Sequence, residues 1–197
     1  MNIYQQRLVL SLIFICFFLP LAVACFLIGN NWHPIGSAQH GELLDPVRPL
    51  DLNFNILDIN RSPIPEKYRK HWILAYISSS SDTCDVRCRT SLYYMSQVRL
   101  ALGKDMDRVE ALFLLESLPD SGMHQWLVAE HPRITVGVAD TTSKSSLLAA
   151  FAQPGQTGDW LYLLDPLSNL LMRYPVNTEP NGLLKDLQHL LKWSKIG

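Results

Sequence analysis

Two cysteines lie four residues apart in the stretch 80–90, SSDTCDVRCRT. Cys84 and Cys88 follow an apolar run and precede a stretch with the pattern of a helix. Two thiols at this spacing can form a disulfide that opens and closes, supply two soft ligands to a metal ion, or be ordinary buried side chains. The other cysteines, Cys16 and Cys25, lie in an N-terminal apolar segment, so one close pair remains in the part expected to fold in water.

The spacing limits how this pair can join. Residues i and i+4 of a helix have Cβ atoms about 5–6 Å apart, whereas a disulfide needs about 3.8 Å. We therefore expect a bond only if the first helical turn is distorted or Cys84 precedes the helix. We expect such a bond to be strained and easily reduced, which suits a redox switch better than a structural link. A plain structural disulfide and two buried cysteines remain as alternatives, although the polar flanks disfavour burial.

The surroundings of the pair favour a reactive thiol. A helix N-terminus carries positive potential and unpaired N–H groups, and both stabilise a thiolate. Arg87 and Arg89 add positive charge beside the cysteines. Cys84 is the expected attacking thiol, because it lies nearer to the solvent-facing loop. Thiolates are also soft ligands that suit Cu(I).

The N-terminal segment has the length of a membrane span. The uncharged run Leu8–Gly29 covers roughly 30 Å as a helix, the thickness of a bilayer core. Arg7 precedes this run, and no Lys or Arg follows it before Arg48, which predicts an exported C-terminal part. Cleavage by signal peptidase after AVA at 22–24, or before Cys25 as in a lipoprotein, remains open, and both would also export the domain. Export places the thiols where they can be oxidised.

Three segments are expected along the chain: a membrane anchor at 1–29, a proline-bearing tether at 30–70 and a folded domain at 71–197. The tether holds one candidate edge strand, from Leu50. A net charge of −1 and a hydrophobic content of 48% exclude a nucleic-acid-binding surface and a disordered chain.

Hydrophobic periodicity predicts alternating strands and helices within 71–197. Strands are expected at 71–78, 108–117, 133–139 and twice within 159–175, and helices at 83–104, 120–131, 142–152 and 180–196. A helix after each of the first three strands favours a parallel core, closed by an antiparallel hairpin. This order resembles a thioredoxin-like three-layer α/β/α domain. In such domains the active-site cysteines lie where the first core strand meets its helix, which is the position of Cys84 and Cys88.

The sequence resembles the Sco/SenC family in three features. Members of this family are membrane-tethered thioredoxin-like factors for cytochrome c oxidase assembly. The three features are the anchor, the C-x-x-x-C motif after a buried strand, and the segment LYLLDPLSNLLMRYP at 161–175. The sequence resembles more closely a divergent group encoded beside cytochrome oxidase genes, through His40–Leu50, Asp165–Pro175 and Gly182–Gly197. The resemblance implies a single-pass protein of the bacterial inner membrane with its domain in the periplasm. It also implies copper as a metal, and the oxidase copper-site subunit and other assembly factors as partners.

The chain departs from Sco proteins at two places. Arg89 stands where a proline usually follows the second cysteine. The stretch PGQTGD at 154–159 lacks the histidine that completes the Sco copper site. The ligands implied by the resemblance are therefore Cys84 and Cys88 alone, as a site for Cu(I).

Other histidines of the chain could supply a third ligand. His124 and His131 are the candidates, but no metal-ligand spacing links them, and each is expected to be a surface or helix-end residue. His71 is expected to be structural and His189 to face solvent. His33 and His40, in the tether, are expected to sample metal only loosely.

Four functions remain open at this point. The first is an exported, membrane-tethered thiol–disulfide factor that reduces the cysteines of the oxidase copper site before metal is inserted. The second is a Sco-type Cu(I) chaperone with an unidentified third ligand. The third is a non-catalytic assembly or scaffold protein. The fourth is a general peroxidase, which is disfavoured because the sequence shows no active-site constellation for it. The missing histidine favours the first, and whether the protein is an enzyme, a thiol–disulfide oxidoreductase, stays open.

Overall fold

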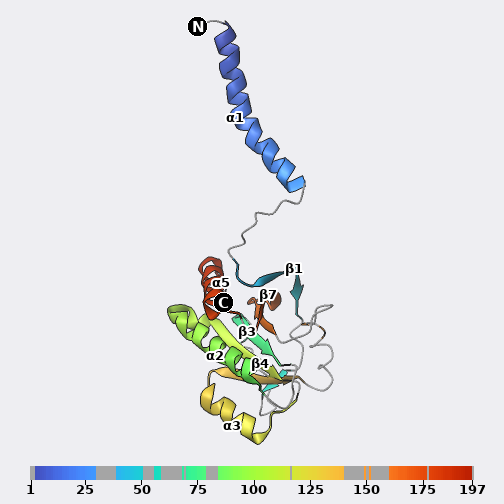
Figure 1. Cartoon of the computed structure of the whole chain (residues 1–197), viewed down its shortest axis with the longest axis vertical. Helices are drawn as coiled ribbons and strands as arrows, with labels where there is room; N and C mark the ends of the chain where they lie inside the picture. Colours follow the sequence, from blue (N-terminus) through green and yellow to red (C-terminus); the bar gives the residue numbers. More distant parts are fainter. Residues whose placement is uncertain are drawn as a thin grey trace. The chain divides into compact units, whose positions relative to one another are not determined.

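The computed structural model describes residues 3–29, 39–50, 56–58, 68, 70–78, 84–115, 117–139, 149, 151, 160–176 and 178–196 (Figure 1). The chain divides into two compact units, Met1–Ala38 and Gln39–Gly197, and each is described by itself.

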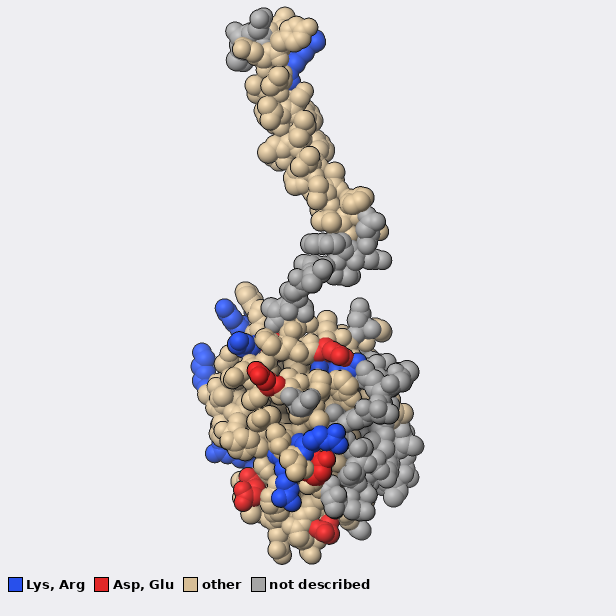
Figure 2. Space-filling model, in the orientation of Figure 1, with Lys and Arg blue, Asp and Glu red and all other residues tan. Residues whose placement is uncertain are grey.

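The first unit contains one long apolar helix, α1 (Ile3–Gly29). Its stretch Ile3–Leu27 is long and apolar enough to cross a membrane, and no part of it is buried by other residues of the protein. Figure 2 shows uncharged surface along α1, with basic atoms only near the N-terminal end. The predicted apolar helix is confirmed, and it begins earlier than the uncharged run because Tyr4 and the glutamines that follow it continue the helix.

The second unit is built on a seven-stranded sheet of order β1-β7-β6-β3-β4-β5-β2. The strands are β1 (Glu42–Pro49), β2 (Ile56–Asp58), β3 (Trp72–Ile77), β4 (Val109–Leu115), β5 (Ile134–Ala139), β6 (Trp160–Leu164) and β7 (Asn169–Pro175). Strands β3, β4 and β5 are parallel, while β6, β7, β1 and β2 pair antiparallel to their neighbours. The predicted parallel core with a closing hairpin is confirmed.

One face of the sheet is covered by α2 (Val86–Ala101), α3 (Ser121–Glu130) and α5 (Pro180–Trp193). The predicted apolar face of α2 is buried, with Leu92 and Met95 at 0% exposure. A short 3-10 helix, η2 (Gly103–Arg108), follows α2, and Gly103 adopts a positive φ of 58°. Gly103 was predicted to end the helix, and it supplies the left-handed conformation that other residues adopt at a cost.

The opposite face has its own apolar cluster, which includes Leu44, Tyr68, Phe151 and Tyr162. Phe151 is helical, and its ring meets the edge of Tyr162 at 5.0 Å between centroids. The rest of the helix predicted at 142–152 lies outside the described residues, apart from Ala149. Described residues therefore pack on both faces of the sheet. The second unit is a mixed α/β domain with the thioredoxin-like order of strands and helices.

The boundary of the domain differs from the expectation. Strands β1 and β2 both come from the segment 30–70, which was assigned to the tether, so the sheet begins near residue 42 rather than at 71. Pro46 and Pro49 are tolerated because β1 is an edge strand, with an irregular register against β7 between Leu43 and Arg48. Most of the short edge strand expected from Leu50 lies outside the described residues, at 51–55, and Ile56–Asp58 form β2 at the edge of the sheet beside β5.

Candidate active site

Cys84 and Cys88 are joined by a disulfide, with their Cα atoms 5.2 Å apart. Helix α2 begins at Val86, so Cys84 precedes the helix and Cys88 lies in its first turn. A position of Cys84 before the helix is one of the two arrangements in which the i, i+4 spacing allows a disulfide. It places the bond in the connection between the carboxyl end of β3 and the start of α2.

Asp85, between the two cysteines, caps α2. Its Oδ1 accepts a hydrogen bond from the Cys88 backbone N–H at 2.8 Å, and its Oδ2 lies 3.3 Å from Arg87 Nε. Aspartate is a preferred N-cap because its side chain satisfies an N–H that the helix leaves unpaired. The same hydrogen bond from Cys88 is the main cause that holds the pKa of Asp85 below its usual range. The cap thus fixes the backbone of one cysteine of the pair.

The two sulfur-bearing residues differ in exposure. Cys88 is 2% exposed and belongs to the main core cluster, whereas Cys84 is half-buried at the edge of that cluster. Val86, between them, is 79% exposed. A partner can therefore approach Cys84 far more easily than Cys88.

Arg89 links the start of α2 to α3. Its Nε donates to the backbone oxygen of Cys84 at 3.3 Å, and its guanidinium carbon lies 4.9 Å from the ring centroid of Trp126. Trp126 packs against the main core and meets the ring of His131 edge-on at 5.1 Å. The sequence identifies Arg89 as a nearby positive charge and as a departure from the usual Sco proline, but it does not predict the contact of Arg89 with Trp126.

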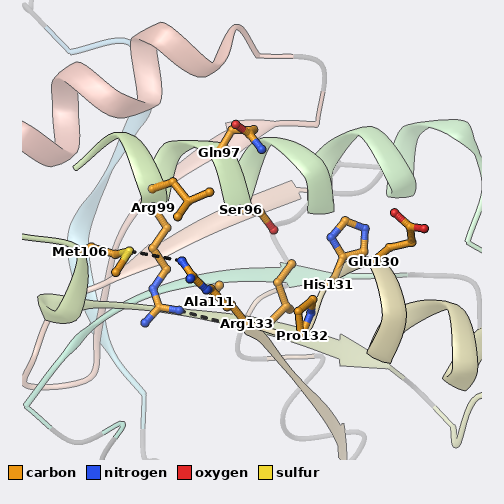
Figure 3. Close-up of a pocket in the computed structure, with 11 residues that line it drawn as sticks. Ser96, Gln97, Arg99, Met106, Ala111, Glu130, His131, Pro132 and Arg133 are labelled. Atoms are coloured by element: carbon orange, nitrogen blue, oxygen red, sulfur yellow. Dashed lines mark hydrogen bonds between the residues drawn. The ribbon is translucent and has the colours of Figure 1, made fainter. Parts of the chain in front are cut away.

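The candidate third ligands occupy other places. His131 is 9% exposed, and its burial lowers its pKa. It lines a pocket of about 270 Å³ together with Ser96, Arg99 and Ile134, and the pocket lining contains no cysteine (Figure 3). His124 is half-buried in α3. Within the described part of the chain, no three His, Cys, Asp or Glu side chains are grouped so as to hold a metal ion.

The remaining histidines were predicted to be structural or peripheral. His189 on α5 is exposed, as expected. His71 lies directly before β3, and its buried Nδ1 has no hydrogen-bond partner among the described residues. The Sco histidine position, within 154–159, and His33 lie outside the described residues. His40 is held by Asp186, whose Oδ1 lies 3.2 Å from the His40 Nδ1.

One residue and one contact of the site were not predicted from the sequence. Asp85 could have been found, since an Asp directly before a helical pattern is an N-cap signal. The contact between Arg89 and Trp126 joins different helices and has no local pattern that would reveal it.

Comparisons with known proteins agree with this architecture. A family model described as "Transmembrane-like, thioredoxin-like, C-terminal domain" matches residues 72–194. A search among curated protein sequences finds no match to the chain.

Several solved structures share the fold. The apo Sco1 protein from Thermus thermophilus has a TM-score of 0.60 and 15% identity, over 80% of this chain and 99% of that one. The copper-bound ScoI of Bradyrhizobium japonicum has a TM-score of 0.52 and 21% identity, over 69% and 96%. BsSco, described as a Sco-family cytochrome c oxidase assembly protein with a disulfide switch, has a TM-score of 0.53 and 14% identity, over 72% and 92%.

The match at 72–194 covers strands β3 to β7 and the helices α2, α3 and α5. The Sco structures confirm the thioredoxin-like fold that the resemblance to Sco/SenC predicted. The chain belongs to the family of transmembrane-like, thioredoxin-like C-terminal domains.

Proposed function

We propose that this protein is a membrane-tethered, exported thiol–disulfide factor that assists copper-site maturation of cytochrome c oxidase. The observation that carries the proposal is the disulfide at the start of α2, with one half-buried and one fully buried cysteine. The Sco-family protein with a disulfide switch, described as an oxidase assembly protein, supports both the chemistry and the setting.

The reaction follows from the unequal exposure of the two cysteines. In the reduced protein, the Cys84 thiolate attacks a disulfide in the copper-site subunit and forms a mixed disulfide, releasing one thiolate of the partner. Cys88 then attacks the Cys84 sulfur, closes the Cys84–Cys88 bond and releases the second thiolate. Two electrons pass from the pair to the partner, and the two protons of the cysteine thiols are taken up by the partner's thiolates. The partner is left with two thiols ready to bind copper.

A copper chaperone is the second candidate, and the copper-bound ScoI structure favours it. Once reduced, Cys84 and Cys88 offer two thiolates, which suit Cu(I) as transferred cargo. The residues 154–159 supply no imidazole at the position where Sco proteins have one. We therefore expect Cu(I) binding and no stable Cu(II) thiolate complex, since Cu(II) favours nitrogen and oxygen donors.

The proposal is tested by mixing the reduced full chain, in detergent, with an oxidised peptide from an oxidase copper site. We expect the peptide to be reduced while the Cys84–Cys88 bond closes. Cys84→Ser should abolish the reaction, whereas Cys88→Ser should trap a mixed disulfide through Cys84. No electron transfer to the peptide would contradict the redox role.

Copper titrations separate the two candidates. Cu(I) binding should be lost in Cys84→Ser and kept in His124→Ala and His131→Ala, with no Cu(II) thiolate absorption in any of them. If the wild type binds Cu(II) and one of the histidine variants loses it, the chaperone function replaces the one proposed here.

A further inference from the structure

Arg89 is the residue through which the cysteine outside the helix is connected to the rest of the domain. Its Nε donates to the Cys84 carbonyl at 3.3 Å, and its guanidinium lies over Trp126 at 4.9 Å. Trp126 is anchored in turn, because it packs against the main core and against the ring of His131. Arg89 therefore connects Cys84 to helix α3. In the sequence, α3 is separated from α2 by β4.

The two cysteines are held by different means. Cys88 sits in the core, and its N–H is fixed by Asp85, so its position does not depend on the disulfide. Cys84 lies outside α2. Among the described residues, Arg89 donates a hydrogen bond to the carbonyl of Cys84, and the Cys84 side chain packs against the edge of the main core. When the disulfide opens, these contacts remain to hold Cys84 near Cys88.

We infer that Arg89 and Trp126 form a clamp that positions Cys84 for attack by Cys88, a role that deepens the proposed thiol–disulfide function and rests on it. In the mixed disulfide, Cys84 is bonded to the partner's sulfur and Cys88 is a free thiol. The clamp holds the Cys84 sulfur within reach of the Cys88 thiolate, which forms the new bond as the bond to the partner breaks. The electron pair of that bond leaves with the partner's thiolate, which then takes up a proton. Arg89 is thus a positioning residue, and it acts through the backbone of Cys84.

The clamp and the positive charge of Arg89 have opposite effects on the redox equilibrium. A positioned Cys84 raises the effective concentration of one thiol at the other and favours the closed disulfide. A positive charge stabilises a thiolate and favours the reduced form. Removing Arg89 therefore shifts the equilibrium away from the disulfide if positioning dominates, and toward it if charge dominates.

Arg87 is the matched control. It lies on the same helical turn, carries the same charge and is 69% exposed, but its contact is with Asp85 and not with Cys84 or Trp126. Arg87→Gln removes one positive charge and leaves the contacts of Arg89 in place. Arg89→Gln removes one positive charge together with those contacts. Arg89→Lys keeps a cation that can still lie over Trp126. Trp126→Leu removes the ring that Arg89 covers while it keeps an apolar side chain.

The experiment equilibrates each variant with reduced and oxidised glutathione, using the full chain in detergent with Cys16→Ser and Cys25→Ser as background. We expect Arg89→Gln and Trp126→Leu to lower the constant for disulfide closure about fivefold, which is about 20 mV at 29.6 mV per tenfold. The mixed disulfide of Cys84 with glutathione should accumulate in both. Arg89→Lys should retain most of the wild-type value, and Arg87→Gln should leave the constant unchanged or raise it.

The clamp is wrong if Arg89→Gln and Arg87→Gln shift the closure constant in the same direction by similar amounts. It is also wrong if Trp126→Leu leaves both the constant and the mixed disulfide at wild-type levels. The equilibrium with glutathione measures closure of the disulfide without any physiological partner. A failed reaction with the oxidase peptide would therefore overturn the proposed function and leave this test of the clamp intact.

Discussion

Asp85 is one of the three residues between the two bonded cysteines, and its carboxylate accepts a hydrogen bond from the backbone N–H of Cys88. It therefore connects helix stability to the position of the buried cysteine. We expect the side chain to cap the helix in either redox state, because the hydrogen bond involves no sulfur atom. At the residue scale, the site consists of Cys88, which is fixed in the core, and Cys84, whose contacts with Arg89 can be altered by single substitutions.

Loss of this cap should destabilise the domain in a pH-dependent way. Asp85→Ala is expected to cost about 1 kcal/mol of unfolding free energy at neutral pH, the typical value for an N-cap. The pKa of Asp85 is lower in the folded protein, so its contribution is full above the unfolded value near 3.9 and is lost as pH falls through the folded value. The difference between wild type and Asp85→Ala in urea unfolding should shrink below about pH 4.

Asp120→Ala provides the control for this prediction. Asp120 caps α3 by accepting the Met123 N–H, away from the disulfide ring. It should lower stability by about the same amount, as N-cap substitutions do. If the deficit of Asp85→Ala is as large at pH 3 as at pH 7, the ionised carboxylate is not the group that caps α2.

At the scale of elements, α5 holds the start of β1. Asp186 on α5 is 5% exposed, and its Oδ2 accepts the N–H groups of His40 and Gly41 at 2.9 and 3.0 Å. It also accepts the hydroxyl of Tyr174 at 3.0 Å, and burial and the Asp186 charge raise the pKa of that tyrosine. A Cβ on Gly41 would overlap the Tyr174 ring, so only glycine fits there. Three segments that are far apart in the sequence, at His40–Gly41, Tyr174 and Asp186, thus meet in one contact.

Asp186→Asn should destabilise the domain by about 2 kcal/mol, because an amide cannot accept all the hydrogen bonds of the buried carboxylate. Tyr174→Phe removes one donor and leaves the two backbone contacts, so it should cost about half as much. Thermal unfolding of both variants measures the difference. A loss in Asp186→Asn no larger than in Tyr174→Phe would mean that β1 is not held by this carboxylate.

The elements that were predictable are those whose pattern is local. β3 is a continuous apolar strand and α2 has a regular apolar face, so both follow from periodicity. β1 was not predicted, because its prolines disfavour a strand and its support comes from distant residues. These include Asp186 and Arg173, whose Nε donates to Glu42 at 2.7 Å. The cysteine pair could be predicted for the same reason as α2, since its chemistry is contained in five consecutive residues.

At the scale of the whole molecule, the apolar helix α1 and the disulfide domain suit two different environments. The long apolar stretch of α1 suits a bilayer, and a closed disulfide suits an oxidising aqueous compartment. The side of the membrane is part of the proposal and rests on the charges that flank the uncharged run Leu8–Gly29. The visible face of the domain carries both signs of charge without a large patch of either (Figure 2), which leaves those flanks to set the orientation.

A reporter fused after Gly197 should be active only if it responds to export, because Arg7 precedes the uncharged run Leu8–Gly29 and no Lys or Arg follows that run before Arg48. The variant Arg7→Gln with Asn30→Lys and Asn31→Lys reverses this bias, so it should lose a large share of the exported signal. Cytoplasmic activity of the wild-type fusion would contradict the topology and remove the compartment argument for the disulfide.

The most direct test of the central claim is whether the Cys84–Cys88 bond opens and closes in the folded protein. One sample of the full chain in detergent is reduced, alkylated for increasing times and mapped by mass. A second reduced sample is reoxidised before it is alkylated, and it is mapped in the same way. We predict that both thiols become free without unfolding, that Cys84 is alkylated well before Cys88, and that reoxidation protects both. A bond that resists reduction until the domain unfolds, or a Cys84 as unreactive as a buried core cysteine, would contradict the account.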